Sequence, residues 1–332
     1  MATNWTWEEM SREFVALGGA VDNVRHGRGP FGHGLFVVDP AKPVRVHVPA
    51  RLLVARDQLV CEEGALVVHP NASIGSREKD FFRRYQASFS WGRAEADCRS
   101  FIEAIDALPN RIRDLLAAEF HLGPMLAGSV AQRTRDRFLD SRVMTTKAGQ
   151  MFMPVVELLN HSPFGTRFDS SDGVTVGGVF EGEVLARYRA ADAFAIFESW
   201  GFASREPAAF SLPLLLTHAG HAIGIRQATS QHVIRDREVS PEVVVSGKLI
   251  SLSHLMLGHT RHPERPFRTF RRLMEEIGQT GARELFDAIR TTNVERFEGL
   301  QLALTGLDGS LAVVLRDMCR FQLEALASCD GE

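Results

Sequence analysis

Cysteine is scarce in this chain of 332 residues, which has only four. They stand at positions 61, 98, 319 and 329, and no two of them are spaced like the cysteine pairs that bind zinc. The spacing predicts that the protein holds no metal. Because the N-terminus does not resemble a signal peptide and the thiols have no evident pairing, we expect the protein in a reducing cytoplasm.

An excess of basic charge and long hydrophobic runs are also missing. Lys and Arg total 38 against 41 Asp and Glu, so the formal net charge is −3, and we expect no nucleic-acid partner. The longest apolar run, Leu212 to Ile225, is too short to span a bilayer, and we expect no membrane partner. This run contains His218 and His221, three residues apart on a possible helix, which are better explained as a structural or surface pair than as metal ligands.

The pattern of hydrophobic residues predicts an α+β fold. Thr6-Trp-Glu-Glu9 reads as a helix capping box, and apolar residues follow at helical spacing up to Gly18-Gly19. Short β-branched runs separated by Gly and Pro predict strands between 23 and 74. Helical spacing returns at 78–140 and 267–328. Further strands are expected at 151–158, 174–180, 183–187 and 240–246.

One segment carries most of the functional information. Pro154-Val-Val-Glu-Leu-Leu-Asn-His-Ser-Pro163 is an apolar stretch that ends in Asn160 and His161. Tyr188, one of only two tyrosines, follows at the end of Glu181-Gly-Glu-Val-Leu-Ala-Arg-Tyr188. Since Asn, Ser and Pro also favour ordinary turns, it is the order and spacing of these segments that indicate function.

Two more segments precede them in a consistent order. His26-Gly-Arg-Gly-Pro-Phe-Gly-His-Gly-Leu-Phe36 is a glycine-rich turn between strands, where glycine permits positive φ and close approach of the backbone to a ligand. It lacks the Lys-Ser/Thr of a phosphate-binding loop. Ser141-Arg142 then precedes the strand that leads into the Asn160 segment.

This ordered set resembles the core of the SET-domain methyltransferases, in particular the branch typified by the Rubisco large-subunit methyltransferase. That branch has the pattern Pro-hydrophobic-hydrophobic-Asp-x-x-Asn-His-Ser, then Gly-Glu-x-hydrophobic-x-x-Tyr, then Tyr-Gly-Phe. The matching residues here are Glu157, Asn160, His161, Tyr188 and Trp200-Gly201-Phe202.

The resemblance implies a SET fold of short β-sheets, divided by a helical insertion and followed by a mainly helical C-terminal lobe. The expected parts are an N-terminal helix in 1–22, the SET domain in 23–77 and 141–208, the insertion in 78–140 and a substrate-binding lobe in 209–332.

It also implies a site for S-adenosylmethionine (SAM) as co-substrate, without a metal. The residues expected to bind this donor are Gly32, His33, Gly34, Leu35, Asn160, His161 and Tyr188. Tyr188 is the expected catalytic residue, orienting the acceptor near the transferring methyl group, whereas His161 is expected to anchor rather than to act as a base. The residues expected to line the substrate channel are Arg142, Glu157, Trp200 and Phe202.

The acceptor is the least defined part of this interpretation. The resemblance favours N-methylation of a side-chain nitrogen in a protein or peptide, Lys first and His second. Glu157 replaces the usual Asp of the branch, and Trp200 replaces its usual Tyr. Because Trp200 keeps a π face but cannot donate the same O–H hydrogen bond, a small-molecule acceptor and a non-catalytic SET binding module remain alternatives.

Overall fold

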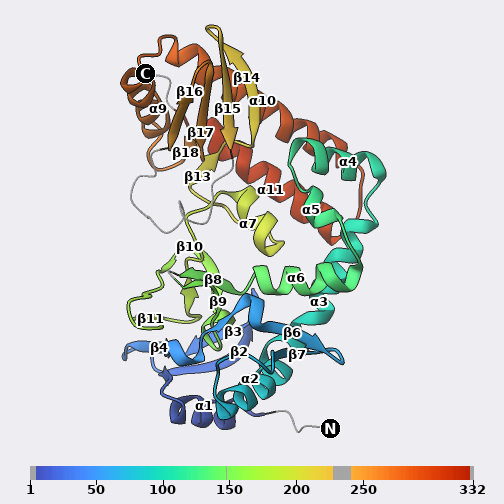
Figure 1. Cartoon of the computed structure of the whole chain (residues 1–332), viewed down its shortest axis with the longest axis vertical. Helices are drawn as coiled ribbons and strands as arrows, with labels where there is room; N and C mark the ends of the chain where they lie inside the picture. Colours follow the sequence, from blue (N-terminus) through green and yellow to red (C-terminus); the bar gives the residue numbers. More distant parts are fainter. Residues whose placement is uncertain (1–4, 147, 227–240, 330–332) are drawn as a thin grey trace. The chain divides into compact units, whose positions relative to one another are not determined.

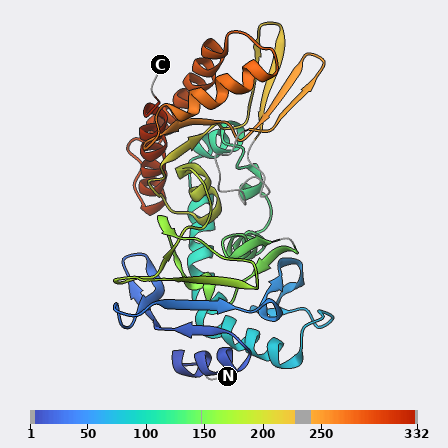
Figure 2. The ribbon, with the colours of Figure 1, turned by 90° about the vertical axis from the view of Figure 1, so that its left-hand side faces the viewer.

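The computed structural model describes residues 5–146, 148–226 and 241–329. Over these ranges the chain combines helices with small sheets of two to four strands, so the predicted α+β class is confirmed. The chain divides into two compact units (Figures 1 and 2). The first comprises Met1–Ile102 and Ser129–Tyr188, and the second comprises Glu103–Gly128 and Arg189–Glu332. The domain borders expected from the sequence stay predictions.

The first unit contains most of the short strands. Its helices are α1 (Trp7–Ala16), α2 (Ser76–Phe89), most of α3 (Trp91–Asp106) and α6 (Val130–Asp140), with 3-10 turns at Ala50–Leu52, Arg56–Gln58 and Val156–Leu158. Its strands are β1 (Ala20–Asp22), β2 (Val24–Gly29), β3 (Gly32–Val37), β4 (Val44–Val48), β5 (Val54–Ala55), β6 (Leu59–Glu62), β7 (Ala65–Val68), β8 (Val143–Thr146), β9 (Gly149–Phe152), β10 (Asn160–Thr166), β11 (Val174–Gly178) and β12 (Leu185–Ala186).

The first helix forms as the sequence predicts. The Thr6 hydroxyl accepts a hydrogen bond from the Glu9 backbone, and the Glu9 carboxylate accepts one from the Thr6 backbone, which completes the capping box. The apolar face of α1 buries Met10 and Phe14, and Phe14 stacks on Phe81 of α2 with ring centroids 5.8 Å apart. These contacts attach α1 and α2 to the same hydrophobic core as the hairpin β2–β3.

Three small sheets position the segments of interest. The hairpin β2–β3 is antiparallel and pairs Gly27 with Gly34 and His26 with Leu35. Strands β10 and β12 pair in parallel, with Asn160 opposite Leu185 and His161 opposite Ala186. In the third sheet, β4 lies between β1 and β11. Residues far apart in the sequence therefore meet beside the glycine-rich hairpin.

The second unit contains more strand than the sequence predicts. Its helices are α4 (Asn110–Glu119), α5 (Gly123–Leu126), α7 (Ala193–Trp200), α9 (Arg265–Glu276), α10 (Ala282–Ala303) and α11 (Ser310–Ala327). Its strands are β13 (Ala208–Phe210), β14 (Leu214–His218), β15 (His221–Arg226), β16 (Val243–Ser246), β17 (Leu249–Ser253) and β18 (Met256–His259). Four of them form one sheet in the order β14-β15-β17-β16.

The helix considered possible at His218 and His221 does not form, because both residues lie in strands. These residues pair across the end of the hairpin β14–β15. Ala219 and Gly220 form its two-residue turn, and both have positive φ, +47° and +77°. Such a turn matches the twist of the flanking strands, so an apolar run that could have been a helix becomes two strands. The strand expected at 240–246 is β16, which begins at Val243; Ser240 lies outside the described residues.

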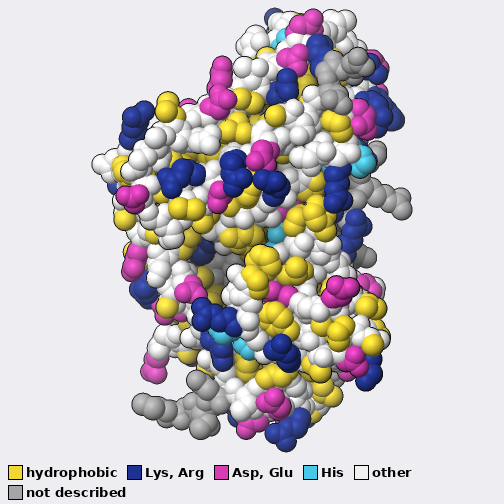
Figure 3. Space-filling view, turned by 180° about the vertical axis from the view of Figure 1, so that it is seen from behind, with side chains coloured by type: hydrophobic (Ala, Val, Ile, Leu, Met, Phe, Trp, Pro, Cys, Tyr) yellow, Lys and Arg dark blue, Asp and Glu magenta, His cyan; other side chains and the backbone are white. Residues whose placement is uncertain are grey.

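The surface carries charge of both signs. On the face shown in Figure 3, basic and acidic side chains lie interspersed among hydrophobic ones. Across the described part of the chain, no helix has both the length and the apolar character needed to cross a membrane.

Candidate donor and catalytic site

The glycine-rich hairpin forms one wall of the site. A Cβ atom added at Gly34 would lie 2.4 Å from Oε1 of Glu183 and 2.8 Å from Nδ2 of Asn160. Both distances are far below van der Waals contact, so only glycine allows these two side chains to approach the strand this closely. Gly32, in the turn, has φ of +93°, a conformation that also favours glycine.

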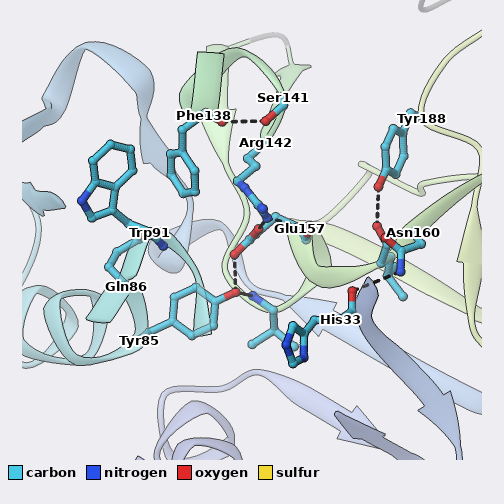
Figure 4. A network of polar contacts seen from close by, with 12 residues as sticks. His33, Tyr85, Gln86, Trp91, Phe138, Ser141, Arg142, Glu157, Asn160 and Tyr188 are labelled. Carbon is cyan, nitrogen blue, oxygen red and sulfur yellow. Dashed lines mark hydrogen bonds and ion pairs between the residues drawn. The ribbon is translucent and has the colours of Figure 1, made fainter. Parts of the chain in front are cut away.

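Asn160 joins the Asn-His segment to this hairpin, 127 residues earlier in the chain. Its Nδ2 donates hydrogen bonds to the carbonyl oxygen of His33 (3.1 Å) and to Oε1 of Glu183 (2.6 Å), and Figure 4 shows the amide directed toward His33. Both partners are acceptors only, so the nitrogen faces them and both amide protons are used. The Oδ1 atom makes no hydrogen bond with the part of the chain that the structure describes, and it remains an acceptor for a ligand.

The backbone carbonyl of His33 faces Asn160, whereas its ring lies on the opposite face of the hairpin. The ring stacks on His26 with centroids 5.2 Å apart and an interplanar angle of 6°, and His26 in turn stacks on Trp7 of α1. Burial, with the nearby charges of Arg93 and His33, lowers the pKa of His26 to about 4, so this ring is neutral at pH 7. Leu35, which lies on the same strand and was also expected to bind the donor, is fully buried.

Tyr188 and His161 are joined where β12 ends. The backbone N–H of Tyr188 donates to Nδ1 of His161 (3.3 Å), and the two rings lie 5.0 Å apart. The Tyr188 hydroxyl donates to the carbonyl oxygen of Leu159 (2.6 Å). Burial, outweighing the nearby Arg142 charge, raises the pKa of Tyr188. The hydroxyl is therefore protonated at neutral pH and acts as a hydrogen-bond donor, not as a base.

A buried network of polar groups holds the stretch of chain just before Asn160 and His161. The side chain of Glu157 is fully buried and forms an ion pair with Arg142. Its other oxygen accepts a hydrogen bond from the Tyr85 hydroxyl (2.5 Å), and that hydroxyl accepts one from the backbone N–H of Val155 (2.9 Å) (Figure 4). The carboxylate of Glu157, the hydroxyl of Tyr85 and the backbone N–H of Val155 thus all have partners, whereas the buried Nε of Arg142 has none among the described residues.

The charges of this network depend on one another. Burial has the largest effect and lowers the pKa of Arg142, but Glu157, Cys98 and Tyr85 together raise it by more, so the net pKa is raised and the guanidinium stays charged. Burial and then the Glu157 carboxylate raise the pKa of Tyr85 well above its usual value. Glu157 and Arg142 were expected to line a substrate channel. The structure places the Glu157 side chain in the core, and the channel assignment of both residues stays a prediction.

The strand expected at 151–158 is only partly right. Strand β9 ends at Phe152, and Val155 takes φ of +71° and ψ of −49°, with the Val156 N–H bonded to the Pro154 carbonyl (2.9 Å). This is a γ-turn of the rare, strained kind. Val155, the central residue of this turn, is β-branched and favours a strand by local propensity. The hydrogen bond from its N–H to the Tyr85 hydroxyl stabilises the turn instead.

Trp200 and Phe202 belong to the second compact unit. Trp200 ends helix α7, and Gly201 caps the helix with φ of +78°. The guanidinium of Arg189 lies 5.2 Å from the centre of the Trp200 ring, so a cation from this chain already covers one ring face. Because these residues and the donor site lie in different units, their place in a channel stays a prediction.

The sequence did not single out Glu183 or Tyr85 as site residues. Glu183 stands in the Gly-Glu of the Tyr188 motif, and that position was the available signal. No sequence signal indicated Tyr85, because its contact with Glu157 joins residues 72 positions apart. Within the described ranges, no group of three His, Cys, Asp or Glu side chains could hold a metal ion, and the expected lack of a metal stays a prediction.

No protein-family model matches the chain, and no curated protein matches it. Among solved structures the chain is similar to SET-domain proteins of the branch that its motifs resemble. One is Rubisco LSMT bound to AdoMet, at 14% identity over 97% of this chain and 89% of that chain, with a TM-score of 0.47. Another is the SET domain of LSMT bound to lysine and AdoHcy, at 12% identity over 98% and 90%, with a TM-score of 0.42. A third, Rubisco LSMT bound to sinefungin and monomethyllysine, has 13% identity over 97% and 89% and a TM-score of 0.44.

Proposed function

We propose that this chain is a SAM-dependent N-methyltransferase of the SET type, acting on a side-chain nitrogen of a protein or peptide. The observation that carries the proposal is the meeting of three distant segments. Asn160 bonds to the backbone of the glycine-rich hairpin, and Tyr188 bonds to the carbonyl just before Asn160. A chance match of short motifs gives no reason for their residues to touch.

The residues fit the donor chemically. The free acceptor of Asn160 and the neighbouring Glu183 carboxylate suit the ammonium of the amino-acid portion of SAM, and Gly34 lets both side chains approach the hairpin backbone. When bound, SAM supplies a methyl group on a sulfonium, an electrophile that reacts with an unprotonated nitrogen in line with the breaking S–C bond. Asn160, His33 and Glu183 would hold the donor, and Tyr188 would act beside the acceptor.

Tyr188 suits an orienting role. Its raised pKa keeps the hydroxyl protonated, so it does not remove the acceptor's proton. A lysine acceptor must reach the site as a neutral amine, and transfer into a dry channel favours that form. A histidine needs less assistance because its usual pKa lies near neutrality. We therefore propose Lys as the first acceptor and His as the second.

One observation favours a small-molecule acceptor as the second candidate. Arg189 already covers one face of Trp200, the residue that replaces the usual Tyr of the branch. A second cation on that ring would meet the positive charge of Arg189, whereas a flat neutral molecule would not.

The four cysteines form no disulfide, and a reducing cytoplasm is the proposed location.

The decisive experiment incubates the protein with methyl-labelled SAM and a cell lysate. S-adenosylhomocysteine release, with label on Lys or His of a protein located by mass spectrometry, supports the proposal. Label on a small molecule supports the second candidate. SAM binding without turnover for any acceptor would indicate a SET module that only binds, and no SAM binding would overturn the proposal. The Tyr188→Phe variant, assayed in the same lysate, separates enzymatic label from background.

A further inference from the structure

The proposed function places Glu183 among the residues that would hold the donor, and its contacts define that role more closely. Its backbone lies against β3, because the Val37 N–H bonds to the Gly182 carbonyl and the Val184 N–H bonds to the Leu35 carbonyl, both at 2.8 Å. This pairing directs the Glu183 side chain over the glycine face of the hairpin. A Cβ added at Gly29 would lie 3.1 Å from Oε2, just as one added at Gly34 would collide with Oε1.

The carboxylate has no cationic partner among the residues that the structure describes. Its one hydrogen bond comes from the Asn160 amide, and it forms no ion pair. The charge of Glu183 acts on Tyr188. It is one cause of the raised pKa of Tyr188, smaller than burial and Glu157. The carboxylate charge is therefore available to a cationic group of a ligand.

Glu183 also determines which way the Asn160 amide points. The His33 carbonyl accepts one amide proton and Glu183 accepts the other. With both acceptors in place, a rotation of the amide by half a turn would set Oδ1 against two oxygen atoms. Without Glu183, only the His33 carbonyl would oppose that rotation.

We propose that Glu183 is a positioning residue of the donor site, which fixes the Asn160 amide so that Oδ1 faces the ligand and adds negative charge for the ligand's ammonium group. This inference rests on the proposed function. It predicts that Glu183 matters for ligands that carry the amino-acid portion of the donor and not for those that end at the sulfur.

Two ligands separate these cases. S-adenosylhomocysteine contains the ammonium group, and 5′-methylthioadenosine has the same nucleoside and sulfur without it. We expect Glu183→Ala to weaken S-adenosylhomocysteine about tenfold, the worth of one charge-assisted hydrogen bond, and 5′-methylthioadenosine less than about twofold. Glu183→Gln keeps an acceptor for the Asn160 amide but loses the charge, so the expected weakening is smaller, about threefold.

Calorimetry on the full chain measures both ligands for each variant. Glu181→Gln is the matched control, because Glu181 is exposed on the same segment and makes no hydrogen bond or ion pair among the described residues, so both affinities should stay at the wild-type value. Thermal unfolding of each variant checks that the fold is intact. If Glu183→Ala does not fold, Glu183→Gln carries the same comparison.

The outcomes are distinct. Selective loss of S-adenosylhomocysteine, partly restored in Glu183→Gln, supports the positioning role. Equal weakening of both ligands, or no weakening of either, overturns it and leaves SAM binding by the wild type intact. If the wild type binds neither SAM nor S-adenosylhomocysteine, the proposed function itself is wrong.

Discussion

The Tyr188 hydroxyl donates a hydrogen bond of 2.6 Å to the backbone carbonyl of Leu159, the residue immediately before Asn160. The Tyr188 backbone is held by His161, the residue immediately after it. Tyr188 thus contacts both neighbours of Asn160. A shift of the Asn-His segment would move the proposed donor contact and the proposed catalytic hydroxyl together, which links donor binding to the geometry of transfer.

The first prediction concerns this hydroxyl. Tyr188→Phe removes the O–H and keeps the ring, so turnover should fall on the order of 10²-fold, as for other positioned donors. SAM affinity should change little, because an interaction made mainly in the transition state affects kcat more than binding. Single-turnover assays and calorimetry measure the two quantities. Wild-type turnover in this variant would remove Tyr188 from the site.

Asn160→Ala should weaken SAM binding instead. The variant loses the free Oδ1 acceptor and the contact to the hairpin, and the expected loss is about 1–3 kcal/mol of binding free energy. Asn71→Ala is a suitable control, since Asn71 is exposed in the same compact unit and its side chain makes no hydrogen bond among the described residues. Equal SAM affinities for the two variants in calorimetry would contradict the assignment.

The third prediction concerns Tyr85. Tyr85→Phe leaves the buried Val155 N–H and one oxygen of Glu157 without their partner. The free energy of unfolding should fall by about 1–3 kcal/mol, the cost of an unsatisfied buried polar group. Urea denaturation measures this loss. Tyr188→Phe, at a half-buried position, provides the comparison and should lose less; similar losses in both variants would argue against the network.

A double-mutant cycle tests the ion pair of Glu157 and Arg142. Glu157→Ala leaves a largely buried guanidinium unpaired, and we expect a loss of about 3–5 kcal/mol in stability. Adding Arg142→Met removes the orphaned charge and should recover part of that loss. If the two effects simply add in urea denaturation, the two side chains do not stabilise each other.

The last prediction uses the two tyrosines as reporters. Both have raised pKa values in the fold, mainly through burial, whereas tyrosines of an unfolded chain ionise near pH 10. Their contribution to stability is complete below about pH 10 and is lost as the pH rises above it. Tyrosinate absorbance should therefore appear together with the loss of circular dichroism. Ionisation near pH 10 in a chain that is still folded would contradict the burial of these side chains.

Local patterns predicted the parts of the fold that depend on neighbouring residues. The capping box at Thr6 and Glu9, the helices in 267–328 and the strand at Val44–Val48 follow from short-range propensity and periodicity. The glycine-rich turn and the Asn-His segment were recognised instead by their order and spacing and by their resemblance to the SET-domain methyltransferases. Their direct contact through Asn160 agrees with the expected donor site, whose ligand residues stay predictions.

The features that the sequence did not predict depend on distant partners. The segment around Val155 has the composition of a strand, but its bond to Tyr85, 70 residues away, favours a strained turn that no local pattern indicates. The apolar run containing His218 became a hairpin because of its two-residue turn. The Gly-Glu of the Tyr188 motif marked Glu183, but its contact with Asn160 was not evident from sequence, because that contact depends on the parallel pairing of β10 and β12.

The division of the chain has an evolutionary consequence. The hydrogen bonds of Asn160 to His33 and Glu183, and those of Tyr188 to Leu159 and His161, lie within the unit formed by Met1–Ile102 and Ser129–Tyr188. Trp200, with the Arg189 that covers it, belongs to the other unit. If Trp200 lines the acceptor channel as predicted, substitutions in the second unit would alter the choice of acceptor and preserve these donor contacts. Under the proposed function, such a chain would acquire new methylation targets without first losing its donor site.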